Sequence, residues 1–469
     1  MFPIFNYILN GTLYVNAKSL IPFLPLALLL VGISLDNLLK HRKKIAGYLL
    51  ISTCIICVLA NLNDQLIPRS NINSKLQKDY QTLVEYIIKN DSSFYRIGDQ
   101  TAAPEALNKI HDMKEYKSSI YSSTQNNNYQ KWIKNNQKNN QAYRNNMMVT
   151  LAGNILSEGM MGEKYVISPK NLEGGYKLIK KSHNLKLYEN EFALPIIYAT
   201  ENELTKESYK ALIYPMTVIS SFANGNQEDE KELEPINFEV IDSKNITIEK
   251  SQSVNIKAKE DNYIILDSKT DLKEKVVFVT FKNNFNKKCN GKKEDQVIDI
   301  NNISNKLTCK GWKYHNKNKT FHYVIVSPGK LKVTLSKGNY DLENITAYAI
   351  PKSKFLDAKA EVTPFKLDTK KTKGDKIIGT INVLKDENMV LALPYDKGFK
   401  VKVDGQEVKY KESIQNGITF PIKKGNHNIE IVYEAPYKDL GSLLSVIGLI
   451  TFIIYSLYMS RNTNKSNQD

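Results

Sequence analysis

The stretch LGSLLSVIGLITFIIYSLYM, residues 440–459, contains no charged residue. At 1.5 Å per residue, its 20 residues match the roughly 30 Å hydrocarbon core of a bilayer. Two tyrosines lie near its far end, and Arg461 and Lys465 follow, an order typical of a helix that leaves the membrane on the cytoplasmic side. The sequence therefore predicts a transmembrane helix here, with residues 460–469 as a cytoplasmic tail.

Two apolar runs near the start of the chain predict two more transmembrane helices, at about residues 19–37 and 45–62. The basic sequence His41-Arg42-Lys43-Lys44 lies between them, and positive charge marks the cytoplasmic side of a membrane. The charges beside all three predicted helices are consistent with the same membrane topology. The sequence therefore predicts a multi-pass protein of the cell membrane whose large domain, from residue 63 to residue 439, lies on the extracellular side.

This topology places residues 1–18 outside the cell, without the basic segment of a signal peptide ahead of the first apolar run. A polar start on the outside resembles a connection between helices. The chain is therefore expected to be the C-terminal portion of a longer polytopic protein. An ordinary three-span protein is the alternative.

The chain carries 65 Lys and Arg against 49 Asp and Glu, a net charge of +16, and only five of the basic residues are Arg. Arg is the residue that reads base edges and phosphates with a bidentate fork, so this Lys-rich balance does not predict nucleic-acid binding. Abundant Asn and Ile beside the Lys indicate an A/T-rich coding bias. A basic external face would still attract anionic wall polymers or lipid headgroups.

The external part of the chain changes character near residue 236. Residues 63–235 predict a mixed α/β domain, which begins with an amphipathic helix at Ser74–Ile88. Residues 236–438 contain short alternating strands with a turn every 8–12 residues, typical of β-sandwich-like modules. The dipeptide Asp404-Gly405 predicts a two-residue hairpin turn near their end. The predicted fold class is thus a membrane-anchored α+β protein with three transmembrane helices, a mixed α/β external domain and β-sandwich-like external modules.

Cys289 and Cys309 both lie in the external part, twenty residues apart. They could form a disulfide bond in an oxidising compartment. Sequence does not show whether their Cα atoms come within about 7 Å, so the pairing stays open. The other two cysteines fall in the second apolar run, and no spacing of Cys, His or acidic residues matches a metal site. No metal and no cofactor are predicted.

Three residues are candidate ligand contacts. Arg96 is one of only five arginines among the 65 basic residues of the chain. It could contact either a phosphate or a structural carboxylate. Tyr121 and Ser122, in the segment IYSS, could face an acceptor sugar or form a turn with a packed tyrosine. The structural role is the preferred one for all three.

Several segments of the external part occur in an order that resembles the bacterial YfhO membrane-protein family. They are Tyr95–Ile97 (YRI), Ile120–Ser123 (IYSS), Leu151–Ser168 (LAGNILSEGMMGEKYVIS), Gly175-Tyr176, Leu187–Pro195 (LYENEFALP), Leu393–Gly405 (LPYDKGFKVKVDG) and Gly425–Pro436 (GNHNIEIVYEAP). Each is weak alone, and the ordered set spans nearly the whole external part. The resemblance covers the C-terminal portion of the family.

The resemblance implies a protein related to C-type glycosyltransferases, which move sugars from polyprenyl-phosphate donors onto external acceptors such as teichoic acids. In such enzymes the catalytic acids lie in an early external loop between the first two spans. Residues 1–18, the first external segment here, contain no Asp or Glu. No catalytic residue is therefore carried over, and the chain alone is not expected to be catalytic.

Two functions follow from this reading. In the first, the chain is the C-terminal portion of a YfhO-like protein of cell-envelope glycosylation and acts beside an upstream membrane chain that supplies the missing helices. In the second, it is a non-catalytic membrane-anchored module that binds a wall polymer or a partner protein.

Overall fold

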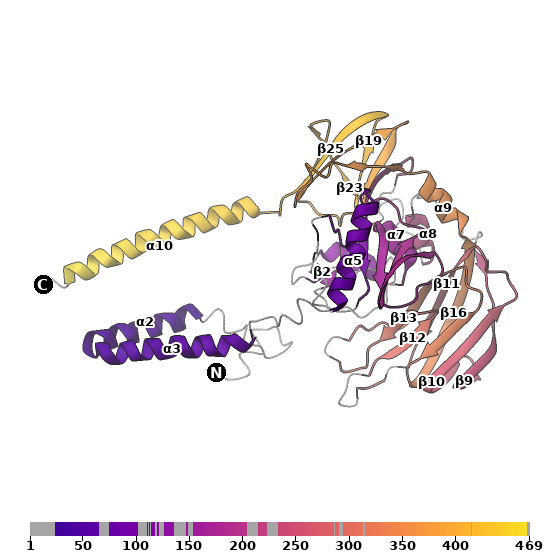
Figure 1. Ribbon diagram of the computed structural model, residues 1–469, viewed down its shortest axis with the longest axis horizontal. Coiled ribbons are helices and arrows are strands. Elements are labelled where there is room, and N and C mark those ends of the chain that lie inside the picture. Colours follow the sequence, from indigo (N-terminus) through magenta and orange to yellow (C-terminus); the bar gives the residue numbers. More distant parts are fainter. Residues whose placement is uncertain are drawn as a thin grey trace. The chain divides into compact units, whose positions relative to one another are not determined.

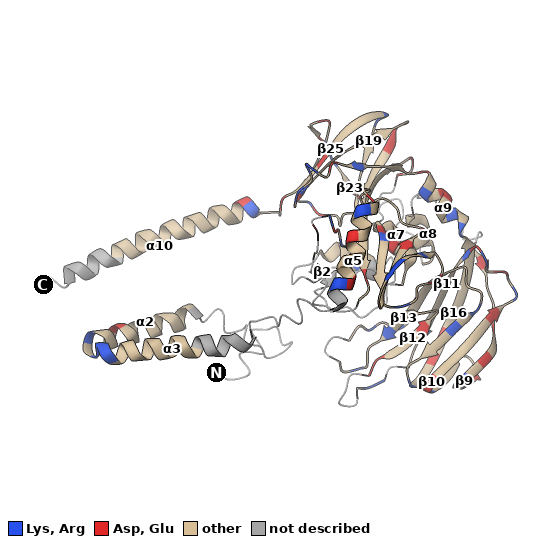
Figure 2. Cartoon of the chain, in the orientation of Figure 1, with Lys and Arg blue, Asp and Glu red and all other residues tan. Residues whose placement is uncertain are grey.

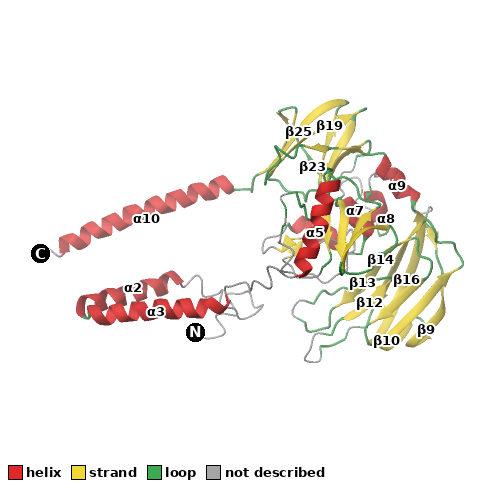
Figure 3. Cartoon of the chain, viewed as in Figure 1, coloured by secondary structure: helices red, strands yellow, loops and turns green. Residues whose placement is uncertain are grey.

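The computed structural model of the protein is built mainly from β-strands (Figure 3). It describes residues 24–64, 75–101, 110, 112, 114–117, 120–121, 126–135, 147–148, 153–203, 214–222, 233–285, 287–289, 294–312, 315–413 and 415–466. The chain divides into two compact units, residues 1–78 and 79–469.

The first unit contains a helical hairpin. Helices α2 (Leu24–His41) and α3 (Lys43–Asp64) are separated by Arg42 alone and contact each other (Figure 1). Most of their described apolar side chains are exposed. The basic turn of the hairpin is the His41–Lys44 segment that the sequence singles out.

The prediction of three transmembrane helices is wrong. Within the described part of the chain, one helix is long and apolar enough to cross a membrane, at Lys438–Tyr458. Helix α2 is 18 residues long, but Asp36 and Lys40 fall in its second half. Its apolar part, residues 24–35, is about 18 Å long, well short of the roughly 30 Å hydrocarbon core. Helix α3 begins with two lysines and ends on Asp64.

The second unit begins within helix α5 (Lys75–Asn90), which packs on a four-stranded sheet. The sheet has the order β1 (Arg96–Asp99), β4 (Glu163–Ser168), β6 (Leu185–Asn190) and β5 (Tyr176–Ser182), with β1 parallel to β4 and the other pairs antiparallel. Apolar residues of α5 recur at helical spacing and pack on one face of this sheet, which confirms the predicted amphipathic helix. The packed residues are Tyr80, Leu83, Val84 and Ile87 of α5 with Ile97, Ile167, Leu185 and Leu187 of the strands.

A nine-stranded sheet follows and wraps around its own core. Strand β10 pairs with β9 along one edge, and with β16 and β15 along the other. The path continues outward to β12 and β13 on one side and to β11 and β14 on the other. The strands are β8 (Glu234–Pro235), β9 (Phe238–Lys250), β10 (Val254–Ser268), β11 (Lys275–Asn283), β12 (Gln296–Ile300), β13 (Ile303–Leu307), β14 (Thr320–Val326), β15 (Leu331–Leu335) and β16 (Gly338–Pro351).

Two five-stranded sheets form a sandwich near the C-terminus. The first has the order β17 (Thr363–Pro364), β7 (Ile197–Thr200), β20 (Glu387–Leu391), β24 (Ile418–Ile422), β23 (Lys411–Glu412). The second has the order β18 (Lys366–Leu367), β19 (Lys376–Val383), β25 (Gly425–Tyr433), β21 (Phe399–Val403), β22 (Gln406–Glu407). Strand β7 comes from before the nine-stranded sheet, so this sandwich joins segments about 160 residues apart in the chain.

The hairpin turn predicted at Asp404-Gly405 is confirmed. It joins β21 to β22, and its two residues have φ of +50° and +82°. Left-handed backbone at both central positions suits the right-handed twist of the paired strands, and Asp-Gly adopts it at low cost. The alternation of apolar and Lys residues in β21 then turns Val401 into the core of the sandwich.

A central core joins these modules. Short helices α7 (Ile155–Met160), α8 (Met216–Ser221) and α9 (Ser353–Ala360) contribute to it, together with strands of the nine-stranded sheet and of the sandwich (Figure 1). Its largest buried side chains include Phe192, Tyr198, Phe278 and Phe355. Only four residues separate β25 from helix α10 (Lys438–Ser466), which contains the candidate span.

Candidate functional site

The second face of the four-stranded sheet carries a row of buried polar groups. Arg96 on β1 and Glu163 on β4 are register partners. Arg96 points away from the α5 face, because the next residue, Ile97, fills the α5 core. Glu163 lies at a shift in the register of β1 and β4, and its carboxylate lies beside Gly98. Gly98 lies on the same face as Arg96, and a Cβ there would collide with the Glu163 carboxylate. The absence of a side chain at Gly98 is therefore what makes room for the acid.

Arg96 is 8% exposed, and its guanidinium Nη1 donates a hydrogen bond to the Met161 carbonyl. Burial lowers the pKa of Arg96, and the nearby Glu163 and Tyr129 act in the opposite direction. A cation removed from water is tolerated when hydrogen bonds and opposite charge compensate for the lost solvation. Arg96 thus acts as the cationic centre of the row.

Helix α6 (Asn127–Asn135) brings aromatic side chains to this row. Tyr129 and Trp132 pack with Met161, their rings 5.9 Å apart. Asn126 caps the helix by accepting a hydrogen bond from the Tyr129 amide, and its Nδ2 donates to the Tyr395 carbonyl of the sandwich region at 2.9 Å. Burial raises the pKa of Tyr129, so its hydroxyl stays protonated at physiological pH.

Glu158, on α7, is a buried carboxyl at the other end of the row. Its Oε1 accepts a hydrogen bond from the Gly153 amide at 3.1 Å, and its Oε2 accepts one from the Tyr176 hydroxyl of β5. Burial raises the pKa of Glu158 to about 7, although both hydrogen bonds oppose this change. The pKa of Tyr176 is raised well above its usual value by burial and then by the charge of Glu158. Near neutral pH, Glu158 therefore exchanges a proton.

The loops that hold Glu158 also contact the nine-stranded sheet. Gly153, with φ of +91°, lies against Ile303 of β13. Gly174, with φ of +57°, lies against the Val326 carbonyl at the end of β14, too close for any side chain. Only glycine combines this backbone conformation with so close an approach. The buried row thus lies where the four-stranded sheet meets the nine-stranded sheet.

We name the five residues Arg96, Tyr129, Glu158, Glu163 and Tyr176 the junction network. Four of them are buried, and Tyr176 is half-buried, so a polymer does not reach the guanidinium and the two carboxyl groups. The junction network can hold and exchange a proton and can fix the modules relative to each other. Among the described residues, no group of His, Cys, Asp and Glu is placed to hold a metal ion.

The residues singled out in the sequence as ligand contacts are not brought together by the described atoms. Arg96 lies inside the junction network. Tyr121 belongs to β2 (Ile120–Tyr121), whose backbone pairs with β3 (Met147–Met148), while Ser122 lies outside the described residues. Sequence reasoning missed Glu158, Glu163 and Tyr176. A signal existed, because all three belong to segments that carry the family resemblance.

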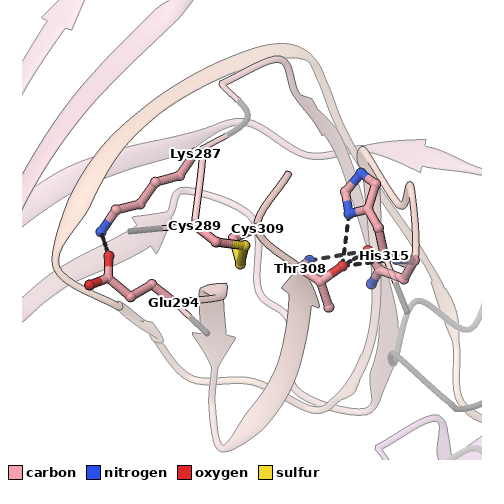
Figure 4. The surroundings of a disulfide bond; sticks show 7 residues. Lys287, Cys289, Glu294, Thr308, Cys309 and His315 are labelled. Carbon is pink, nitrogen blue, oxygen red and sulfur yellow. Dashed lines mark hydrogen bonds and ion pairs between the residues drawn. A yellow bond between two sulfur atoms is a disulfide. The ribbon is translucent and has the colours of Figure 1, made fainter. Parts of the chain in front are cut away.

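Cys289 and Cys309 form a disulfide bond, with their Cα atoms 5.3 Å apart (Figure 4). The bridge closes a loop that contains the hairpin of β12 and β13. Beside it, Lys287 pairs with Glu294, and the Thr308 hydroxyl lies 2.8 Å from His315 Nδ1 (Figure 4). Cys309 is buried, so the bridge is part of the module rather than a surface attachment.

Replacing both bridge cysteines with serine is expected to lower the free energy of unfolding by about 3 kcal/mol. This is the chain-entropy contribution of a bridge between residues 20 positions apart. Urea unfolding of the full chain in detergent, with Cys54→Ser as the control, measures the change. Equal unfolding midpoints for the double variant and the control would contradict the prediction.

The described part of the chain combines β-sheets with one helix, directly after the last sandwich, that is long and apolar enough to cross a membrane, an arrangement typical of membrane-anchored proteins. The family described as bacterial membrane protein YfhO matches residues 2–445. The chain therefore belongs to the YfhO family of bacterial membrane proteins, as its sequence segments indicated, and it is a membrane protein.

The chain is 20% identical over 303 residues to the uncharacterized protein YfhO of Bacillus subtilis (strain 168). The match covers 62% of this chain and 35% of the relative, so the chain spans about a third of the relative's length. Among solved structures, the dimeric latent PorU of Porphyromonas gingivalis shows a likeness with a TM-score of 0.14 and 10% identity, over 55% of this chain and 27% of that one. A score this low carries no argument about fold.

Proposed function

We propose that the chain acts in the glycosylation of an anionic cell-envelope polymer of the teichoic-acid type, and that its modules bind the polymer acceptor on the extracellular side of the membrane. In this proposal a polyprenyl-phosphate sugar is the donor, and a second membrane chain supplies the catalytic acid. Membership in the YfhO family and the net charge of +16 support it. Figure 2 shows Lys and Arg on helices and strands of several modules.

One observation carries the polymer-binding part. On the edge strand β5, Lys181 lies directly opposite Lys186 of β6. Like charges in opposite positions of a sheet destabilise it. Lys170 follows the end of β4 by two residues, and the Tyr188 hydroxyl of β6 donates to its carbonyl. We name Lys170, Lys181 and Lys186 the lysine patch. A polyanion bound across the lysine patch would relieve this repulsion.

Neutralising the lysine patch tests the proposal. The variant Lys170→Gln/Lys181→Gln/Lys186→Gln is expected to bind poly(glycerol phosphate) about tenfold more weakly, since three surface ion pairs contribute roughly 0.5 kcal/mol each. The wild-type affinity should also fall as salt is added. The control variant Lys250→Gln/Lys257→Gln/Lys259→Gln removes the same charge from exposed positions of β9 and β10. Equal losses in the two variants would show that only net charge matters, and would contradict a defined site.

A sugar-transfer assay distinguishes the glycosylation role from the non-catalytic binding role. Membranes that contain the chain are supplied with a polyprenyl-phosphate sugar and poly(glycerol phosphate), with and without the membrane protein encoded immediately upstream. Transfer only with the second protein supports the glycosylation role. Binding without transfer in either preparation favours the alternative, a non-catalytic envelope module that binds a wall polymer or a partner protein. Transfer by the chain alone would overturn the assignment of catalysis to a second chain.

A further inference from the structure

Two of the segments that carry the resemblance to the YfhO family contact each other immediately before the candidate span. The turn Asp396–Phe399 belongs to the segment LPYDKGFKVKVDG, and the linker Glu434–Tyr437 follows strand β25. Together we name this turn and this linker the collar. Its position is independent of the junction network, which contains no residue of either segment.

The collar is held together by several hydrogen bonds. The Glu434 amide donates to the Gly398 carbonyl at 2.8 Å, and Lys400 pairs with Glu434 at 2.7 Å. The Tyr410 hydroxyl lies 2.9 Å from both the Asp396 and the Phe399 carbonyl. A Cβ on Gly398 would collide with the Glu434 carbonyl, so turn and linker pack backbone to backbone. The turn and the linker of the collar therefore form an ordered surface held by hydrogen bonds.

The chain connection places the collar near the bilayer. Helix α10 begins at Lys438, four residues after Glu434 is bonded to Gly398. Four residues span at most about 14 Å. The turn of the collar therefore lies within about this distance of the first residue of the candidate span.

The exposed side chains of the collar suit the lipid headgroup region. Tyr437 is 82% exposed and directly precedes the span. Tyrosine is enriched at this level of membranes because its ring is apolar and its hydroxyl is polar. Lys397 is exposed on the turn, and exposed Lys438 opens the helix. Lysines next to a span attract anionic headgroups, and the attraction fades within a Debye length.

We propose that the collar is a contact surface for the bilayer, in which Tyr437 lies at headgroup level and Lys397 and Lys438 bind the phosphates of anionic lipids. The C-terminal sandwich is then held against the membrane at a fixed height by the turn as well as by the chain connection. A wall polymer is the less suitable occupant, because the span itself brings lipid phosphates within reach of both lysines.

A spin label measures whether the turn touches the bilayer. In the full chain with Cys54→Ser and Cys57→Ser, a nitroxide is placed at Lys397→Cys and, as a control, at Leu384→Cys. Leu384 is 75% exposed and follows Val383, which pairs with Gly425 at the other end of β25 from the collar, roughly 27 Å of strand away. In vesicles of phosphatidylcholine and phosphatidylglycerol, collisions with a water-soluble nickel complex should be several-fold fewer at position 397. Equal collision rates at the two positions would overturn the bilayer contact.

Lipid retention tests the anionic preference. The variant Lys397→Gln/Lys438→Gln should keep about half as much phosphatidylglycerol, or less, after purification from the same membranes. The control Lys385→Gln/Lys424→Gln removes the same charge from exposed positions at the far end of the sandwich. Equal retention by both variants would overturn the lysine–phosphate contacts. Protection of position 397 that requires added poly(glycerol phosphate) would instead assign the turn to a polymer.

Discussion

Replacing Arg96 with alanine is expected to lower the free energy of unfolding by about 3–5 kcal/mol. The variant removes the guanidinium that donates to the Met161 carbonyl, and it leaves Glu163, 1% exposed, without its neighbouring cation. A buried carboxylate that loses the compensating charge is strongly destabilised, because water cannot replace the lost interaction. Urea unfolding of the full chain in detergent measures the change.

A paired substitution separates loss of charge from loss of packing. In Arg96→Met/Glu163→Gln, both charges are absent and the side-chain volume is largely kept. Replacing both partners of a buried ionic pair with neutral groups costs far less than removing one. The double variant should therefore recover most of the stability that Arg96→Ala loses. A double variant as unstable as Arg96→Ala would contradict the charge argument. It would assign the loss to the missing hydrogen bond to the Met161 carbonyl, since the side-chain volume is largely kept.

The local structure around Asp404-Gly405 and α5 could be predicted from the sequence because short-range rules decide it. The spacing of Tyr80, Leu83, Val84 and Ile87 fixes a helical face, and Asp-Gly fixes a hairpin turn. The number of spans could not be read from apolar runs alone. Asp36 and Lys40 lie within α2 and shorten its apolar part, while the uncharged run at residues 440–459 lies within a single helix.

The junction network could not be predicted for a different reason. Arg96, Glu158 and Tyr176 come from β1, α7 and β5, and their approach depends on the sheet order β1-β4-β6-β5. No local pattern encodes that order. The resemblance to the family marked the right segments without showing that they meet. Burial assigns Arg96 a structural role. Its guanidinium donates a hydrogen bond inside the protein and does not reach an external phosphate.

The free energy of unfolding is expected to fall as the pH rises from about 4.5 to about 7, because of Glu158. Burial raises the pKa of this carboxyl from 4.5 to about 7 in the folded protein. Between these values the folded state holds a proton that the unfolded state has released. Folding is therefore favoured at the acidic end of the window, and the contribution is lost as the pH rises through 7. Its full size is of the order of 3 kcal/mol.

The variant Glu158→Gln should remove this pH dependence. The Gln carbonyl can accept from the Gly153 amide, and its amide can donate to the Tyr176 oxygen, so both contacts of the neutral acid are kept. Glu158→Gln should match the wild type near pH 4.5 and exceed its stability at pH 8. Glu239→Gln, at an exposed position paired with Lys269, should leave the slope unchanged.

A further variant tests whether the hydrogen bond from Tyr176 sets the position of the window. The Tyr176 hydroxyl lowers the pKa of Glu158 by stabilising the carboxylate. Tyr176→Phe should therefore move the upper end of the window to higher pH. If Glu158→Gln keeps the wild-type slope, the titrating group lies elsewhere. If the slope vanishes in Glu158→Gln and shifts in Tyr176→Phe, Glu158 is the group that sets the pH dependence of stability, and Tyr176 sets its window. The titrating carboxyl then lies beside the loops whose glycines, Gly153 and Gly174, lie against Ile303 and Val326 of the nine-stranded sheet.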